Sequence, residues 1–367
     1  MNTTVDIPLN TLKDAVARVK LAVQTSGFQE LTEMLLILVD DDGLTFAAYD
    51  YETWIVHTVD VPVQGDSAGG GVLAASFTDL VRLLPDEVTL TFTEDSLQIA
   101  SGPTDATLNL IPAKEYPDPP TAPTDGLAFT AGDLQAALQR VTFSASTDQS
   151  FPVLTGVLAE FAEDTLTLVT ADGFRLSRQT VILPNTIADP FSVILPASSL
   201  KKLQSILKRV DEAEVVTFVS DARRARFLAG STLVTTQLID GNYPDYERII
   251  GGAAESTTIQ IGRKAFLAAC QRAWIFNNSV VRLEANGSFV IQAPAQGSGQ
   301  GETVLDVETE GEEGCRSFNP QFLIQALRAV ETDRVTMRYN MTGSNPASLG
   351  VTGDDDWLHV VMPMAVE

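Results

Sequence analysis

The chain has 367 residues and a formal net charge of −24, and 44% of its residues are hydrophobic and 20% charged. This composition is typical of a globular protein and excludes a disordered one, and the length suits roughly two to four domains. The N-terminus shows no signal pattern, the longest apolar run is Met34–Val39, and Cys270 and Cys315 are the only cysteines. We therefore expect a cytoplasmic protein with no membrane span and no disulfide framework.

The spacing of apolar residues predicts alternating helices and strands along the whole chain. Helices are predicted over Leu12–Val23, Phe77–Leu84, Leu134–Phe143, Leu200–Val210, Phe266–Phe276 and Phe322–Val330. Strands are predicted over Thr4–Ile7, Met34–Val39, Leu44–Ala48, Glu87–Phe92, Leu127–Thr130, Leu154–Ala159, Leu166–Thr170, Glu214–Val219, Thr258–Ile261, Val280–Leu283, Phe289–Gln292 and Arg334–Tyr339.

The predicted elements repeat three times. Leu80, Leu200 and Phe322 occupy equivalent places in helices 120 and 122 residues apart, and two Tyr-Pro-Asp triplets lie 127 residues apart. This spacing indicates three copies of one α+β domain, each with two helices and mostly antiparallel strands. With Pro117–Gly126 and Gly251–Glu255 as linkers, the predicted domains are residues 1–121, 122–250 and 251–367.

Positive charge is concentrated in the predicted helices. The windows 10–23, 76–84, 132–141, 197–209, 262–274 and 320–330 hold 13 of the 24 basic residues but only 3 of the 48 acidic ones. A solvated charged face is one explanation for a single helix. The same asymmetry in six helices also suits contact with phosphates. No aromatic residues interleave with the basic ones as a base-stacking platform would require, and the set does not resemble a recognition helix with Asn, Gln and Arg aimed at base edges. The expected contact is electrostatic and independent of sequence.

Four segments, in this order and spacing, resemble the bacterial β sliding clamp, the processivity subunit of the replicative DNA polymerase. They are Pro152–Phe161 (PVLTGVLAEF), Thr170–Ser177 (TADGFRLS), Gln237–Ile250 (QLIDGNYPDYERII) and Val360–Met364 (VVMPM). The resemblance covers essentially the whole chain, including its three tandem copies. It implies three DNA-clamp domains and a head-to-tail homodimer that closes into a ring, with helices around the hole and a continuous sheet outside.

The resemblance also implies that double-stranded DNA threads the ring without being read. The basic residues expected to face this DNA are Lys13, Arg18, Lys20, Arg82, Arg140, Lys201, Lys202, Lys208, Arg209, Arg263, Lys264, Arg272 and Arg328. The replicative polymerase, the clamp loader and repair proteins are expected to bind through short linear motifs.

In the family, such motifs enter a cleft between the second and third domains. The matching residues here are Leu154, Ala171, Gly173, Phe174, Leu176, Pro244, Arg248, Ile249, Asn319, Phe322, Val360, Met362 and Met364. Apolar and flexible side chains suit varied partners, although the pattern alone also fits core strands. Phe174 stands where His is common, Ala171 where Thr is common and Ala365 where Arg is common, so the partner preference is expected to differ.

The resemblance further places Ala106, Thr107, Leu108, Ile275 and Phe276 at the dimer interface. Ala106 occupies a position where an aromatic residue can complete the contact, which implies different packing. From the residues alone, Trp274–Phe276 also fits the buried end of a helix.

No enzyme motif accompanies these features. The chain has no G-x-x-x-x-G-K-[ST] phosphate loop, and its two histidines, His57 and His359, belong to different repeats. We interpret Gly297–Glu302 as a hairpin loop, and Asp40–Asp42 and Asp354–Asp356 as carboxylates at hairpin tips. We therefore expect a non-enzymatic clamp without cofactor or metal. The alternative is an acidic, strand-rich hydrolase or carbohydrate-binding protein with a carboxylate pair in a concave pocket.

Overall fold

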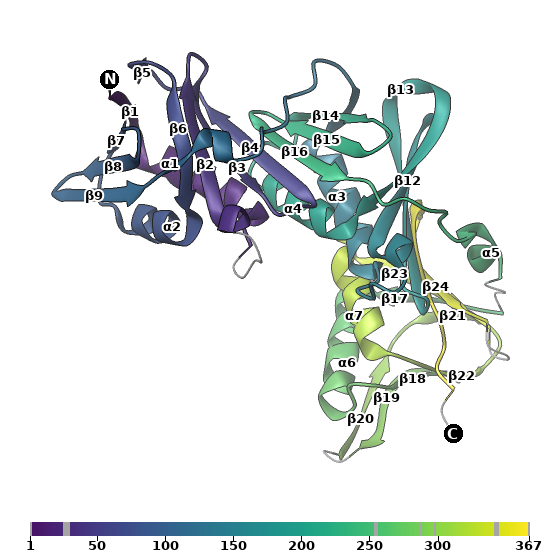
Figure 1. The fold of residues 1–367 in the computed structure, drawn as a ribbon. Coiled ribbons are helices and arrows are strands. Elements are labelled where there is room, and N and C mark those ends of the chain that lie inside the picture. The colour runs from purple at the N-terminus through teal and green to yellow at the C-terminus, as the bar shows by residue number, and fades with distance from the viewer. Residues whose placement is uncertain are drawn as a thin grey trace. The chain divides into compact units, whose positions relative to one another are not determined.

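A computed structural model describes residues 2–24, 30–252, 256–286, 288–296, 299–340 and 345–365. The chain divides into two compact units (Figure 1). Unit 1 comprises residues 1–133 and 198–238, and unit 2 comprises residues 134–197 and 239–367.

Over its described residues, unit 1 contains a five-stranded and a nine-stranded antiparallel sheet. The smaller sheet has the order β5 (Val63–Gln64), β1 (Thr3–Ile7), β7 (Val88–Phe92), β8 (Ser96–Ser101), β9 (Thr104–Asn109). The larger has the order β10 (Ile111–Pro112), β6 (Ala68–Leu73), β2 (Met34–Asp40), β3 (Gly43–Tyr49), β4 (Thr53–Val59), β16 (Thr232–Gln237), β15 (Arg224–Ala229), β14 (Val215–Ser220), β11 (Leu127–Thr130).

The helices of unit 1 bury one apolar stripe each. They are α1 (Leu9–Val19), α2 (Ala74–Leu83) and, from Ser198 onward, α4 (Ala197–Leu207). In α4, Leu200, Leu203 and Ile206 recur at helical spacing and are almost fully buried, which leaves Lys201 on the exposed side. Short 3₁₀ turns at Lys20–Ala22, Glu30–Glu33 and Ala113–Glu115 complete the described elements of this unit.

Unit 2 contains a seven-stranded and a four-stranded antiparallel sheet over its described residues. The larger has the order β12 (Gly156–Ala171), β13 (Arg175–Pro196), β25 (Asp354–Val361), β24 (Ala347–Val351), β23 (Arg334–Tyr339), β17 (Thr257–Gly262), β21 (Glu308–Gly311). The smaller has the order β20 (Gly299–Leu305), β19 (Phe289–Gln296), β18 (Val281–Ala285), β22 (Gly314–Phe318).

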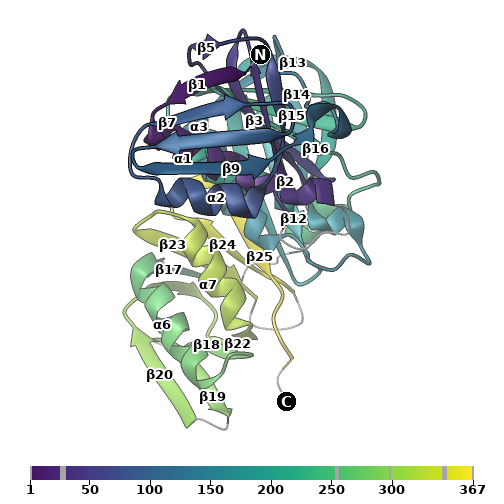
Figure 2. The ribbon, with the colours of Figure 1, turned by 60° about the vertical axis from the view of Figure 1, so that its left-hand side comes forward.

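The helices α6 (Arg263–Phe276) and α7 (Pro320–Ala329) lie side by side in unit 2 (Figure 2). Their buried residues, among them Phe266 and Leu323, join one core with side chains from both sheets of the unit. Unit 2 also includes most of α3 (Ala131–Val141), the short α5 (Tyr246–Gly251) and 3₁₀ turns at Thr142–Ser144 and Pro152–Thr155. No helix in the described part of the chain is long and apolar enough to cross a bilayer.

Every predicted helix is present, although its ends shift by a few residues. One shift affects residues predicted to face DNA. The helix α4 ends at Leu207, so Lys208 and Arg209 follow the helix instead of lying within it. The helix α5 was not predicted, since six residues are too few to show a helical period.

Four strand and loop predictions need correction. Pro152–Thr155 is a 3₁₀ turn, and the strand predicted from Leu154 begins at Gly156 and continues through the run predicted as separate at Leu166–Thr170. Asp354, Asp355 and Asp356 belong to β25, whereas Asp41 and Asp42 form the hairpin tip between β2, which ends at Asp40, and β3. The loop predicted over Gly297–Glu302 is part of strand β20 from Gly299 onward. Residues 297 and 298 of this loop and residues 253–255 of the predicted linker lie outside the described residues.

The compact units do not coincide with the three sequence repeats. The middle repeat contributes β11 and β14–β16 to unit 1 but β12 and β13 to unit 2. The reason is that backbone pairing crosses the repeat boundaries: Thr232–Thr236 pair with 53–57 of the first repeat, and Arg175–Gln179 pair with 357–361 of the third. Sheet hydrogen bonds therefore join each neighbouring pair of repeats.

Candidate DNA and peptide sites

Most of the predicted DNA-facing side chains are at least partly open to solvent. Apart from Arg140, Lys202 and Arg263, which are half-exposed but have partners within the protein, the exposed or half-exposed ones are Lys13, Lys20, Arg82, Lys201, Lys208 and Arg209 in unit 1, and Lys264, Arg272 and Arg328 in unit 2. Arg82 has an ion pair with Asp79 at 3.5 Å, but both side chains are so exposed that the pair is weak. These residues remain available for long-range electrostatic contact.

Arg18 and Lys202 have internal roles in unit 1. The buried Arg18 contacts Asp14 at 2.6 Å, donates to Thr232 Oγ1 at 3.2 Å and donates to the Arg209 carbonyl at 3.3 Å. Burial alone raises the pKa of Asp14, but hydrogen bonds from Arg18 and Arg209 outweigh this and hold it below its usual value. The guanidinium of Arg18, which the sequence predicted to face DNA, is therefore bonded inside unit 1.

Lys202 has an ion pair with Asp50 and donates to Thr53 Oγ1 at 3.0 Å, so its ammonium also has partners within unit 1. In unit 2, Arg263 donates to the carbonyls of Thr332 at 2.8 Å and Leu327 at 3.0 Å. The Leu327 carbonyl lies in the last turn of α7, where a positive charge is favourable, and Thr332 follows the helix. Arg263 therefore stabilises unit 2, to which both of its partners belong.

Arg140 lies in a further internal network. It donates to Gln179 Oε1 at 3.0 Å and lies 3.7 Å from Asp354, while its carbonyl accepts the Trp357 indole N–H at 3.0 Å. These contacts join α3 to β13 and β25 in unit 2. Arg140 remains half-exposed, so only part of its charge is directed to solvent.

The predicted peptide site has a buried apolar base. Leu154, Ala171, Leu176 and Val360 belong to one hydrophobic cluster. The cluster also includes Val153, Leu158, Val169, Ile194, Ile239, Tyr243, Tyr246, Ile250 and Leu358. Sequence distances of up to about 200 residues separate the members, and the pairing of β12, β13 and β25 brings them together.

Exposed apolar side chains come from the segments that contact this base. We call Phe174, Ile249, Met362 and Met364 the apolar rim; each is more than a third exposed, and Phe174 is 65% exposed. The Met362 N–H donates to the Phe174 carbonyl at 2.8 Å, which joins two rim residues directly. Gly173 between β12 and β13 has φ +88°, a conformation that favours glycine in this turn.

The remaining predicted site residues have different environments. Pro244, Gly173 and Arg248 are exposed, and the Arg248 backbone N–H donates to Asp245 Oδ1 at 3.3 Å as α5 begins. Asn319 caps α7 by accepting the Gln321 N–H at 2.9 Å. Phe322 packs against the core of the third repeat, not against the apolar base of the peptide site.

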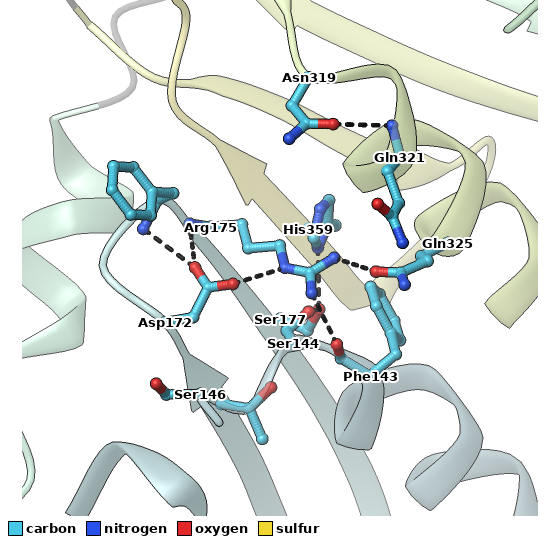
Figure 3. Close-up of polar contacts among 12 residues, drawn as sticks. Phe143, Ser144, Ser146, Asp172, Arg175, Ser177, Asn319, Gln321, Gln325 and His359 are labelled. Atoms are coloured by element: carbon cyan, nitrogen blue, oxygen red, sulfur yellow. Dashed lines mark hydrogen bonds and ion pairs between the residues drawn. The ribbon is translucent and has the colours of Figure 1, made fainter. Parts of the chain in front are cut away.

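Sequence reasoning missed Arg175, which has several polar contacts next to the turn that carries Phe174 (Figure 3). Its side chain is 8% exposed. It donates to Asp172 at 2.9 Å, to the Phe143 carbonyl at 2.9 Å and to Gln325, and its guanidinium lies 4.3 Å from the centre of the Phe322 ring. Burial lowers the pKa of Arg175 from its ordinary value, and the Asp172 carboxylate opposes this shift. The sequence signal for Arg175 was its position within the segment Thr170–Ser177, which resembles the family.

His359 lies under the same network, stacked on Trp357. Its Nδ1 is 2.8 Å from Ser177 Oγ, which is 2.7 Å from Ser144 Oγ. Complete burial, with a smaller contribution from the Arg175 charge, lowers the pKa of His359 to about 3. A histidine held neutral by its surroundings and bonded to the Ser177 hydroxyl has a structural role here.

The predicted interface residues lie on one outer strand and at one helix end. Ala106, Thr107 and Leu108 belong to β9, the edge of the five-stranded sheet in unit 1. Ile275 is 70% exposed at the end of α6 in unit 2. Phe276 is half-buried, and a Cβ on Gly301 of β20 would approach its ring to 2.6 Å. Phe276 therefore packs on the β20 edge of its own chain.

Within the described ranges, no group of three or more His, Cys, Asp or Glu side chains is arranged to hold a metal ion. Asp42 N–H donates to Asp40 Oδ1 at 3.0 Å, a contact typical of a solvated turn. Cys270 and Cys315 are free thiols, and burial raises the pKa of both.

Comparison with known proteins is consistent along the whole chain. Family models of the DNA polymerase III beta subunit match its N-terminal domain at residues 3–120, its central domain at 129–245 and its C-terminal domain at 253–365. The beta sliding clamp of Bacillus subtilis is 28% identical and that of Pseudomonas putida 27%, with 98% and 90% of this chain covered and 98% and 91% of those proteins.

Solved structures have the same fold. A DNA polymerase sliding clamp from Bacillus subtilis has a TM-score of 0.92 at 25% identity, with 100% of both chains covered. A Pseudomonas aeruginosa sliding clamp bound to griselimycin also has a TM-score of 0.92, at 24% identity, with 100% of both chains covered. These findings do not support the alternative of a strand-rich hydrolase or carbohydrate-binding protein. Since three domain models match in order along the chain, it belongs to the bacterial DNA polymerase III beta subunit family, the beta sliding clamps.

Proposed function

We propose that two copies of this chain form a closed ring that encircles duplex DNA and tethers the replicative polymerase, the clamp loader and repair proteins. What carries the proposal is the distribution of charge. A chain of net charge −24 places exposed Lys and Arg side chains on the helices of a threefold repeat. We keep the domain limits at residues 1–121, 122–250 and 251–367.

The DNA-facing set is narrower than the sequence suggested. We assign the contact to Lys13, Lys20, Arg82, Lys201, Lys208, Arg209, Lys264, Arg272 and Arg328. Their exposed cations can approach phosphates, while the acidic strands and loops repel DNA from the rest of the surface. Contacts of this kind do not read bases, so retention must come from the closed ring.

The ring requires two equal head-to-tail interfaces. We assign them to β9 of one copy and β20 of the other, because each is an outer strand of its described sheet with backbone groups open to pairing. Ala106 and Leu108 are half-buried on β9. The exposed Ile275 beside β20 supplies the apolar contact, and Phe276 supports that strand from within its own chain.

The apolar rim is assigned to short linear motifs of partner proteins. Flexible methionines at Met362 and Met364 allow the surface to fit different apolar side chains. Phe174 adds an uncharged aromatic face. The protein is assigned an accessory role in the cytoplasm, with no catalytic residue of its own.

The central test compares circular and linear DNA. Light scattering should give the mass of two chains. After loading onto a nicked plasmid with the clamp loader of the same organism, the protein should stay bound through gel filtration and leave within minutes once a restriction enzyme linearises the plasmid. We expect at least about a tenfold difference in retained protein. Equal loss from circular and linear DNA would contradict the topological mechanism.

Replacing Met362 and Met364 together by Ala should weaken binding of a polymerase-derived peptide by about 30- to 900-fold. The truncations remove two exposed apolar side chains, each worth about 1–2 kcal/mol when a partner buries it. Fluorescence polarisation with a labelled peptide measures the change. Val215→Ala, at an exposed valine of β14, is the control and should bind as the unmodified protein does. Unchanged affinity in the double variant would remove the rim from the peptide site.

A further inference from the structure

We infer that Arg175 is a positioning residue of the peptide site, which acts through Asp172 to fix the turn that presents Phe174 and which links this turn to helix α7 of the third repeat. The inference rests on the peptide site proposed above. It assigns a role to a residue that is not itself part of the apolar rim.

The first step is the turn itself. Asp172 Oδ1 accepts the backbone N–H groups of Phe174 and Arg175, both at 3.0 Å (Figure 3). These two bonds close the turn around Gly173 and hold the Phe174 backbone. The Phe174 carbonyl in turn accepts the Met362 N–H at 2.8 Å. One carboxylate oxygen therefore fixes the turn that carries Phe174, and this turn also bonds the backbone of Met362.

The second step is the other oxygen of the same carboxylate. Asp172 Oδ2 accepts the Arg175 Nε–H at 2.9 Å, so the aspartate is shared between the turn and the guanidinium. Both side chains are largely buried, at 8% and 15% exposure. A buried charge that loses its partner is strongly destabilised. The pair thus orients the carboxylate that holds the turn.

The third step connects the pair to the neighbouring elements. The two terminal nitrogens of Arg175 donate to Gln325 of α7 and to the Phe143 carbonyl at 2.9 Å. The guanidinium also lies 4.3 Å from the Phe322 ring centre and 5.5 Å from that of Phe143. The planar guanidinium holds its hydrogen-bond donors in a fixed geometry, which the lysine ammonium lacks. Arg175 therefore aligns the turn against α7.

The consequence for binding is preorganisation. If the turn samples other conformations, the apparent dissociation constant rises in inverse proportion to the populated fraction that is competent. A fall in that fraction to about one tenth gives a tenfold weaker complex without removal of any side chain from the contact surface.

The test compares Asp172→Asn and Gln325→Ala with the unmodified protein. Asn keeps an oxygen for the turn but loses the charge that faces Arg175, and should raise the dissociation constant of a fluorescein-labelled polymerase-derived peptide about tenfold. Gln325→Ala removes one contact on α7 and should raise it about threefold. Gln321→Ala, at an exposed position of the same helix, is the matched control and should change nothing.

A spectroscopic readout separates positioning from direct contact. With 4-fluorophenylalanine incorporated at position 174, the unmodified protein should give one sharp ¹⁹F resonance. In Asp172→Asn the resonance should broaden or split before any peptide is added. In an Arg175→Met background, Asp172→Asn should have a much smaller further effect on affinity, because the two residues act as one unit. Gln325→Ala provides the same comparison if Asp172→Asn does not fold.

The outcomes are distinguishable. If the unmodified protein binds no polymerase-derived peptide, the proposed function fails and the inference fails with it. If it binds, and the folded Asp172→Asn and Gln325→Ala variants bind equally well with an unchanged ¹⁹F resonance, only the role of Arg175 is overturned.

Discussion

A chain carrying Ile275→Asp is expected to be monomeric at micromolar concentration and to lose its retention on circular DNA. The native isoleucine is 70% exposed in the single chain, so the substitution leaves the fold of unit 2 nearly undisturbed. In the proposed ring the new carboxylate would be buried without a partner, which costs about 3 kcal/mol at each interface. A dimeric ring has two such interfaces, and about 6 kcal/mol corresponds to roughly a 10⁴-fold rise in its dissociation constant.

Ile182→Asp is the matched control for this experiment. Ile182 is 64% exposed on β13 of the same unit, so the chemical change and the initial exposure are nearly equal. Sedimentation equilibrium should report dimers for this control and monomers for Ile275→Asp, with similar far-ultraviolet circular dichroism. Dimers in both variants would exclude α6 from the interface.

Acidification from pH 7 to 4.5 is expected to destabilise both units through one buried histidine each. Burial lowers the pKa of His359 to about 3, and burial followed by the Arg18 charge lowers that of His57 to about 4. Each group is neutral in the folded chain, whereas the unfolded chain takes up a proton as pH falls below about 6.5. The stabilisation is therefore complete above that pH and is lost progressively toward the folded pKa, by about 2.5 kcal/mol per histidine at pH 4.5.

Hydrogen exchange measured by mass spectrometry can follow the two units separately. Protection of β13 and β25 reports on His359, and protection of β4 and β16 reports on His57. His359→Gln should flatten the pH dependence in β13 and β25 while leaving that of β4 and β16 unchanged, and His57→Gln should do the reverse. Carboxylates also respond to acid, so the comparison between variants isolates each histidine. If protection changed with pH equally in the unmodified protein and in both variants, the acid response would not come from His359 and His57.

The sequence alone predicted the repeated helices, fewer than half of the described strands and the concentration of positive charge on the helices. This succeeded because amphipathic spacing is local: Leu200, Leu203 and Ile206 define the buried stripe of α4 without knowledge of any partner. The family motifs likewise selected Leu154, Ala171, Leu176 and Val360, which meet in one cluster. Boundaries were less accurate where a short element, such as α5, contains too few residues to show a period.

Only the tertiary structure decided which of these charges are free and how the peptide site is held. Arg18 and Thr232 are separated by 214 residues, and Arg175 and Gln325 by 150, yet each pair is hydrogen-bonded. Residue type shows that a side chain can donate hydrogen bonds, but its acceptors depend on which strands pair across the repeat boundaries. The sequence by itself therefore determined the repeat and its polarity, and long-range packing decided that Arg18 lies inside the fold and that Arg175 supports the rim.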